Sequence, residues 1–187
     1  MTSPLTILDC TLRDGGYFND WRFDKELAKD LVDCVVRSGV DIIEVGYKTP
    51  ATADTGDFGG LFRYCPESQL NFLREHTGSQ FAFMVDAKEY QSDGRLDTDT
   101  LKATILPAAE SAFSWARVAS HYNSFDTASE LTRHLKAMGY QVAMNLMGMS
   151  LLNDAQIERA LMLLPTGDLD VFYFADSFGS FEPADVR

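Results

Sequence analysis

The chain carries the segment LDCTLRDGGY at Leu8–Tyr17. Polar and apolar residues alternate through its first half, and an arginine, an aspartate and two glycines follow. Alternation with period two is typical of a β-strand, and glycines let the backbone turn sharply beside a ligand. We therefore expect a strand over Thr6–Leu12 that carries Arg13 and Asp14 to its C-terminal end.

Similar strand-length segments recur along the chain and alternate with stretches of helical spacing. The expected strands are Thr6–Leu12, Asp41–Tyr47, Gln80–Asp86, Phe113–Ser120, Gln141–Gly148 and Val171–Asp176. The expected helices are Asp24–Ser38, one beginning at Pro66, Asp99–Ala112, Asp126–Met138, one opened by a capping box at Asn153–Gln156, and one over Glu182–Val186. This alternation predicts a parallel sheet covered by helices.

The polarity of the first two expected strands favours a barrel over an open, doubly wound sheet. A strand covered by helices on both faces is apolar on both. Here one face carries Thr11 and Arg13 on the first strand, and Glu44 and Gly46 on the second. A polar face is typical of strands that line a barrel mouth. No Gly-x-Gly-x-x-Gly follows the first strand, which disfavours a dinucleotide-binding redox domain.

The length of the chain limits how much of a barrel it can form. A complete (β/α)₈ barrel takes about 250 residues, and this chain has 187. We predict the α/β class: a (β/α)₈ TIM barrel with about six units present, in one C-terminally incomplete domain over residues 1–187. A truncated or partial sequence is the simplest account, and a naturally short protein completed by a partner is the other.

Composition limits the possible binding partners and the cellular compartment of the protein. The net charge is −12 and the pI is near 4.5, so nucleic acid and anionic membranes are poor partners. No apolar run is long enough for a membrane span, and the N-terminus lacks the pattern of a signal peptide. The three cysteines are scattered, which fits free thiols in the cytoplasm. Open barrel edges favour association, so we expect a homo-oligomer or a partner that covers them.

Arg13 and Asp14 carry the clearest chemistry. Active sites of barrels lie at the C-terminal ends of the strands, where this pair is expected. A fixed guanidinium can stabilise an oxyanion, and a carboxylate beside it can hold a hard divalent cation. The alternative is a solvated ion pair in a turn.

Three motifs occur in order along the chain: Asp-x-Thr-Leu-Arg-Asp-Gly at 9–15, Ile-Glu-x-Gly at 43–46 and Asp-Ser-x-Gly at 176–179. They resemble the signatures of the hydroxymethylglutaryl-CoA lyase-like (DRE-TIM metallolyase) superfamily, in particular the N-terminal part of its aldolase branch, the 4-hydroxy-2-oxovalerate aldolases. The resemblance implies a metal-dependent carbon–carbon lyase of aldolase type, acting on a small 2-oxo acid through a pyruvate enolate.

The same resemblance implies a role for each matching residue. Arg13 matches the arginine that stabilises the enolate, and Asp14 matches a ligand of a divalent metal, which would be Mn²⁺, Mg²⁺ or Zn²⁺. Glu44 matches a glutamate near that arginine, and it either takes part in catalysis or only orients Arg13. Further residues at the expected mouth are candidates for substrate binding: Asp176, Ser177, Asn145, Arg117 and His121.

The sequence departs from the family pattern in two places. Family aldolases use a histidine shortly after Arg-Asp-Gly as base, whereas this chain has Gly16 and Tyr17 there. Tyr17 is the catalytic candidate at this place, as a group that relays a proton through water, although an unperturbed phenol with a pKa near about 10 is a weak base. The identity of the base therefore stays open. The family's His-x-His metal ligands are also absent, since the histidines are His76, His121 and His134.

Two alternatives to the aldolase remain at this point. One is a transferase of the same superfamily that condenses an acyl-CoA with a 2-oxo acid. The other is a non-catalytic barrel fragment that serves as a scaffold or subunit, which the missing His-x-His would favour.

Overall fold

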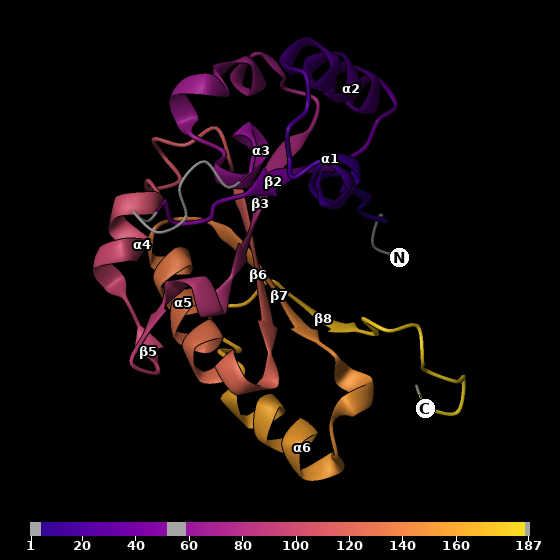
Figure 1. Cartoon of the computed structure of the whole chain (residues 1–187), viewed down its shortest axis with the longest axis vertical. Helices are drawn as coiled ribbons and strands as arrows, with labels where there is room; N and C mark the ends of the chain where they lie inside the picture. The colour runs from indigo at the N-terminus through magenta and orange to yellow at the C-terminus, as the bar shows by residue number, and fades with distance from the viewer. Residues whose placement is uncertain (1–4, 52–58, 186–187) are drawn as a thin grey trace.

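The computed structural model describes residues 5–51 and 59–185. Its main sheet has six strands in the order β1-β2-β3-β6-β7-β8, and every neighbouring pair is parallel. The strands are β1 (Leu8–Asp9), β2 (Ile42–Tyr47), β3 (Gln80–Asp86), β6 (Trp115–His121), β7 (Gln141–Met147) and β8 (Val171–Ala175). Parallel strands in sequential order, curled into part of a (β/α)₈ barrel, confirm the predicted fold class (Figure 1).

In Figure 1, α4 and α5 lie on one side of this sheet, and both ends of the described chain lie on the other. The α-helices are α1 (Thr11–Gly15), α2 (Lys25–Arg37), α3 (Leu61–Tyr64), α4 (Thr98–Thr104), α5 (Phe125–Ala137) and α6 (Asp154–Leu163). The predicted capping box is confirmed, because Asn153 and Gln156 each accept the other's backbone N–H at 3.0 Å. Such a box satisfies two donors at the start of a helix.

The first strand is shorter than predicted. β1 ends at Asp9, and α1 begins where the strand was expected to continue. The Asp9 carboxylate accepts the Thr11 backbone N–H at 3.1 Å and the Thr11 hydroxyl at 2.9 Å, which turns the chain into a helix. Arg13 and Asp14 therefore sit on a helical turn above the strand end.

Three predicted helices were wrong in type or extent. The segment after Pro66 forms two 3₁₀ turns, η2 (Glu67–Gln69) and η3 (Asn71–Glu75). The helix expected to reach Ala112 ends at Thr104, because Pro107 restricts the residue before it and lacks a backbone donor. The helix expected over Glu182–Val186 is a single hydrogen-bonded turn up to residue 185, and residue 186 lies outside the described part.

An antiparallel hairpin was missed by the sequence analysis. It pairs β4 (Gln91–Ser92) with β5 (Arg95–Leu96). Asp93 and Gly94 form its turn with φ angles of 48° and 76°. Aspartate followed by glycine is a standard hairpin signal, because both positions need the left-handed conformation.

A register shift in β2 decides which side chains face the barrel interior. Glu44 pairs with Ala82, but Gly46 pairs with Phe83, so Val45 is an extra residue in β2. Paired residues of neighbouring strands face the same side of a sheet. Gly46 therefore faces the helices, contrary to the prediction that it shares a face with Glu44. A Cβ on Gly46 would lie 2.0 Å from the carbonyl oxygen of Phe62 in α3, so the close approach of that backbone requires glycine here.

Two apolar clusters fill the two sides of the sheet. The larger fills the space between the strands and the helices, where it includes Phe83, Leu131 and Met144, and it also extends to Tyr47 and Met84. The smaller lies on the inner side and consists of Ile42, Ala82, Trp115 and Ala143, with Leu8 and Val171 packed against it. Further along the strands the inner side turns polar. Over the ranges that the structure describes, no helix is both long and apolar enough to cross a membrane.

Candidate active site at the carboxyl ends of the strands

Glu44 joins two arginines at the polar end of the inner face. Its Oε1 accepts the Nε–H of Arg13 at 2.5 Å, and its Oε2 accepts an Nη1–H of Arg117 at 2.6 Å. The Glu44 side chain is 0% exposed, and both arginines are nearly buried. Two guanidinium groups share this one buried carboxylate, and the second carboxylate of the group, Asp14, is half exposed. The arrangement suits an anionic ligand.

The ion pair with Glu44 keeps Arg13 in its charged form. Burial disfavours the cation, but the charge of the Glu44 carboxylate and its hydrogen bond outweigh that effect and raise the pKa of Arg13 above its ordinary value. Arg13 therefore remains a guanidinium cation over the whole physiological pH range. Its planar fork is held in one orientation, as an oxyanion-stabilising group requires.

Arg117 and Asn145 bring further polar atoms to the inner face. The Arg117 guanidinium lies 5.1 Å from the ring centroid of Tyr173 on β8. Considering the described residues only, Nε of Arg117 and Oδ1 of Asn145 are buried and have no hydrogen-bond partner. Buried polar atoms without a partner mark places where a ligand or water belongs. Both predicted substrate-binding residues therefore lie on the inner face, with unused hydrogen-bonding capacity.

Asp14 lies at the rim of the same group. One of its carboxylate oxygens accepts from Arg13, and the other accepts from the Cys10 thiol at 3.0 Å. Its side chain is 53% exposed, but its ion pair with Arg13 is direct, and its charge contributes to the raised pKa of Arg13. In the parts of the chain that the structure covers, no three His, Cys, Asp or Glu side chains converge as metal ligands would. One carboxylate is not a metal site, so the described donors do not by themselves fit a bound metal.

Tyr17 and Tyr47 form a hydroxyl pair beside the arginines. Tyr17 comes from the 3₁₀ turn η1 (Gly16–Phe18), and its Oη lies 2.7 Å from Oη of Tyr47. Tyr17 is 63% exposed and Tyr47 is 5% exposed. Tyr17 was predicted as a site residue but Tyr47 was not, because strict alternation along β2 would place Tyr47 among the helices. The extra residue Val45 turns it inward, where it shares a face with its pairing partner Met84.

Asp176 and Ser177 hold the loop after β8 together. The Asp176 carboxylate accepts the backbone N–H of Phe181 at 2.8 Å and of Ser180 at 3.1 Å, and these bonds lower the pKa of Asp176. The Ser177 hydroxyl accepts the backbone N–H of Gly148, at the end of β7, at 2.9 Å. His121, exposed at the end of β6, lies near the same glycine. These residues are gathered at the strand ends, but their hydrogen bonds in the structure organise loops.

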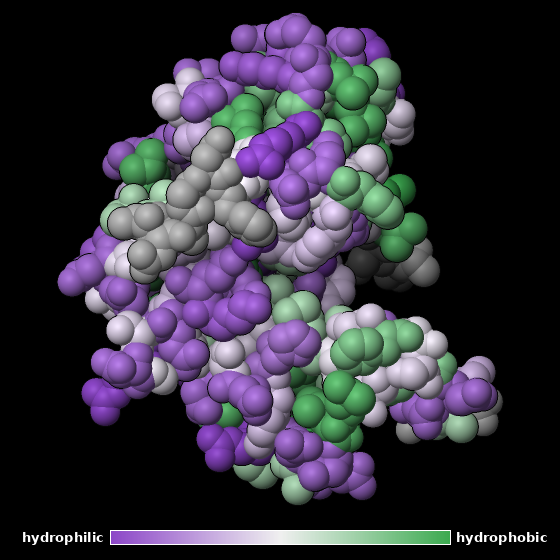
Figure 2. Space-filling model, viewed as in Figure 1, coloured by the Kyte–Doolittle hydropathy of each residue, from purple (hydrophilic) through white to green (hydrophobic). Residues whose placement is uncertain are grey.

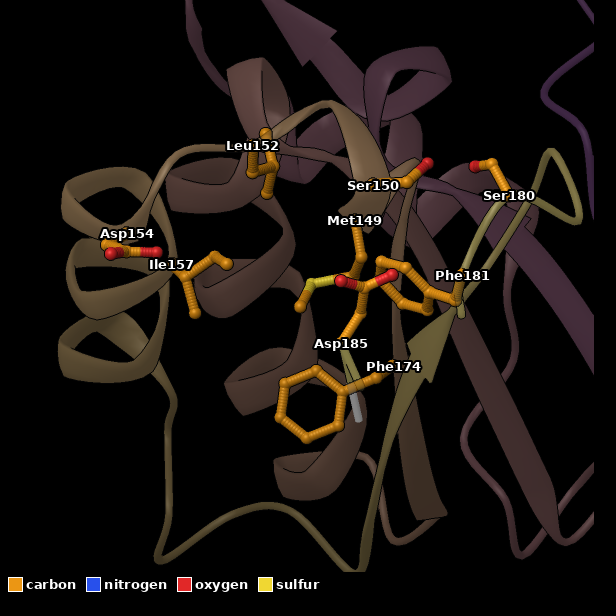
Figure 3. A pocket seen from close by; sticks show the side chains of 9 residues that line it. All are labelled: Met149, Ser150, Leu152, Asp154, Ile157, Phe174, Ser180, Phe181 and Asp185. Carbon is orange, nitrogen blue, oxygen red and sulfur yellow. The ribbon is translucent and has the colours of Figure 1, made fainter. Parts of the chain in front are cut away.

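A hollow in the surface lies away from the arginine group. It has a volume of about 820 Å³ and opens between α6 and the segment after β8, on the helix side of the sheet (Figure 3). Its lining residues are Met149, Ser150, Leu152, Asp154, Ile157, Phe174, Ser180, Phe181 and Asp185. Hydrophobic surface gathers in the same region (Figure 2). The lining has two carboxylates and no cation, which suits an acidic ligand poorly. None of Arg13, Glu44 or Arg117 contributes to it.

Comparison with known proteins points to aldolases. No family model matches the chain. It is 22% identical over 182 residues to the 4-hydroxy-2-oxovalerate aldolase of Geobacillus genomosp. 3, covering 97% of this chain and 51% of that protein. For the enzyme of the same name from Pelotomaculum thermopropionicum the identity is 26% over 193 residues, with the same two coverages. The chain thus spans about half the length of these curated relatives.

A solved structure agrees with these relatives. The N-terminal domain of a protein assigned as an aldolase, from Bacteroides vulgatus, is 28% identical and superposes with a TM-score of 0.78. The match covers 97% of this chain and 57% of that chain. The predicted resemblance to the N-terminal part of an aldolase is confirmed by these likenesses.

Proposed function

We propose that the chain is the N-terminal part of a carbon–carbon lyase of aldolase type and binds a 2-oxo acid beside Arg13 and Arg117. The observation that carries this proposal is the pair of guanidinium groups held by the fully buried Glu44 at the carboxyl ends of the strands. The likeness to 4-hydroxy-2-oxovalerate aldolases supports it and suggests a 4-hydroxy-2-oxo acid as substrate.

The chemistry of such a substrate matches the charges of the site. When the bond between C3 and C4 breaks, the 4-hydroxyl loses its proton, C4 leaves as an aldehyde, and the bonding electrons form an enolate on the 2-oxo acid. The enolate then takes a proton at C3 to give pyruvate. Arg13 would stabilise the enolate oxygen, and Arg117 and Asn145 would hold the other oxygens of the acid. Glu44 would orient the two arginines.

Asp14 is proposed as one ligand of a divalent cation, Mn²⁺, Mg²⁺ or Zn²⁺, which would act as a Lewis acid on the 2-oxo group. The other ligands would come from groups other than the described residues. Asp176 and Ser177 are proposed to shape the mouth through their loop, and Tyr17 to exchange protons with water. The base that takes the hydroxyl proton is not among these assignments.

The test is pyruvate release from a 4-hydroxy-2-oxo acid by the complete gene product, with each of the three metals added. Arg13→Lys keeps the charge but loses the planar fork, and we expect turnover to fall by up to about 10²–10³-fold. Arg159→Lys is the matched control, because Arg159 pairs with Asp126 on the exposed surface of the helices. No pyruvate release by the unmodified protein with any metal would reject the proposal.

Two other functions make different predictions. A condensing transferase would release free CoA from an acyl-CoA in the presence of a 2-oxo acid, and a lyase would not. A scaffold would show neither reaction. The incomplete set of metal ligands among the described residues favours the scaffold function.

We also propose that the open edges of the sheet are covered in the working protein. Among the described strands, β1 and β8 each pair on one side only. Unpaired edges favour association with further strands. Light scattering on the isolated 187-residue chain should therefore find oligomers or aggregates, and a stable monomer would contradict this.

A further inference from the structure

We infer that Tyr47 is a further catalytic residue of the proposed site: its hydroxyl donates to the substrate oxygen on the carbon that leaves as the aldehyde. The inference rests on the proposed function and extends it to the distal half of the substrate. It is drawn from the position of Tyr47, from the contacts that fix its ring and from the number of protons that the two hydroxyls carry.

The position of Tyr47 follows from the extra residue in β2. Tyr47 pairs with Met84 on β3, and Met84 pairs with Arg117 on β6, so all three face inward. Glu44 lies on the same face of β2 and is the inward-facing residue next to Tyr47, on the side of the apolar inner cluster. The phenol is near enough to Arg13 and Glu44 for both charges to influence its pKa. A ligand held by Arg13 would thus have Tyr47 beside it.

The ring of Tyr47 is fixed from two sides. Trp21 meets it edge-on, with the ring centroids 5.4 Å apart. The Arg63 guanidinium lies 4.8 Å from the ring centroids of both Tyr47 and Trp21. The indole N–H of Trp21 also donates to the carbonyl oxygen of Arg13 at 2.9 Å. Trp21 therefore positions both Arg13, which would contact the enolate, and Tyr47, which would contact the aldehyde oxygen. Preorganised catalysis requires such fixed side chains.

The proton count leaves one donor for the substrate. Tyr17 and Tyr47 share one hydrogen bond in which either hydroxyl can donate, so one of their two protons is left for a third oxygen. When Tyr17 donates within the pair, the free proton is that of Tyr47. Burial and the hydrogen bond with Tyr17 raise the pKa of Tyr47 far above its ordinary value, so the phenol stays protonated at neutral pH.

The proton transfers balance in the direction of condensation. As the enolate C3 bonds to the aldehyde carbon, the aldehyde oxygen takes the Tyr47 proton. Tyr47 takes the proton of Tyr17, and Tyr17 is replenished from water, which its 63% exposure permits. Cleavage runs the same transfers in reverse. In this scheme Tyr17 supplies Tyr47 and does not act on the substrate directly.

The experiment separates the two halves of the reaction. Exchange of the C3 protons of pyruvate for deuterium, followed by NMR, needs the enolate but no aldehyde, whereas condensation needs both. With the complete gene product, Tyr47→Phe should leave exchange within about threefold of the unmodified protein and lower condensation by about 10²-fold or more. Tyr17→Phe should lower condensation less and also spare exchange.

Tyr140→Phe is the matched control. It removes a hydroxyl that donates to the Leu106 carbonyl at 2.7 Å, next to the opposite end of β7. Any loss of activity in this variant should affect exchange and condensation alike. Tyr17→Phe keeps the inference testable if Tyr47→Phe does not fold. The Tyr17 side chain is exposed and contributes little to packing, so its variant should fold normally.

The outcomes are distinct. Equal loss of exchange and condensation in Tyr47→Phe, or full condensation activity in either site variant, would overturn the inference. If the unmodified protein neither exchanges pyruvate protons nor condenses, the proposed function itself fails, and the inference falls with it.

Discussion

Glu44 on β2 hydrogen-bonds to Arg117 on β6 across the intervening strand β3, at 2.6 Å between Oε2 and Nη1. Two strand spacings amount to about 9–10 Å, so the bond requires a long side chain reaching over the inner face. It joins residues 73 positions apart in the sequence. The charged layer of the site is therefore part of the sheet's tertiary structure and does not exist in any one βα unit.

Replacing Glu44 by glutamine should destabilise the protein, because two nearly buried guanidinium groups would lose their shared anion. Removing one partner of a buried ion pair costs about 3–5 kcal/mol. We expect a loss of that size in the free energy of unfolding, measured by urea denaturation. Glu158→Gln, at an exposed position of α6, should change it by less than about 0.5 kcal/mol. Similar stability in both variants would contradict the bridging role of Glu44.

Gly46→Ala tests the close approach of α3 to β2. The added Cβ would meet the Phe62 carbonyl oxygen at 2.0 Å, so backbone must move. We expect a loss of about 1–3 kcal/mol in the free energy of unfolding, the usual cost of overpacking. Gly167→Ala is the control, since a Cβ there has no atom within 4 Å. If the two variants unfold at the same urea concentration, the contact between β2 and α3 is not as described.

Glu67→Gln should destabilise the protein through Lys48. The buried Lys48 ammonium donates to Glu67 at 3.0 Å and to the Cys65 carbonyl at 3.0 Å. Without the carboxylate it would be a buried cation with no counter-charge, and the loss should be about 3 kcal/mol. Thermal denaturation at neutral pH measures it. Unchanged stability would mean that Lys48 does not depend on Glu67 as its counter-charge.

The same carboxylate predicts a pH dependence. Burial acts to raise the pKa of Glu67, but hydrogen bonds from Ser111 and Ala112 and the charge of Lys48 lower it overall. A folded-state pKa below the unfolded one gives stabilisation that is present above the unfolded value of about 4.5 and is lost as pH falls through the folded value. Urea denaturation between pH 3 and 7 should show a steeper acid loss in the unmodified protein than in Glu67→Gln. Parallel curves would contradict this.

The three cysteines should differ in reactivity. Burial, with a hydrogen bond to Asp14, raises the pKa of Cys10 to about 11, and burial raises the pKa of the fully buried Cys65 to about 12. The thiolate is the reactive form, so both should resist alkylation near neutral pH. With iodoacetamide at pH 8, mass spectrometry should find Cys34, which is exposed, modified first. Alkylation of Cys10 as fast as Cys34 would count against its protected thiol.

The sequence predicted the architecture because hydrophobic period and element length are local signals. β3 has the predicted bounds, and α2 and α5 differ from prediction by a residue at each end. Arg13, Asp14 and Glu44 could be predicted as site residues because charged motif residues at the end of a strand suggest a chemical role from the sequence alone. The start of a helix at Thr11 was not predicted because it depends on the hydrogen bond that the Asp9 carboxylate accepts from the Thr11 backbone N–H.

Tyr47 and Lys48 could not be predicted for a different reason. A period of two assigns faces correctly only while the register is unbroken, and the extra residue Val45 reverses every assignment after it. The one sequence signal for that break is Gly46, because glycine inside a strand often marks a bulge or the close approach of another backbone. In the structure the backbone of α3 occupies the space beside Gly46.

The extra residue also bears on how the mouth would respond to a change in chain length. Deleting the single codon for Val45 would place Gly46 directly after Glu44, so that Gly46 would still face the helices and Tyr47 the mouth. The bulge would be lost, and the phenol would keep its place. In a lineage of such barrels, a one-residue length change at this point of β2 could therefore be absorbed while the groups that face the mouth stayed the same.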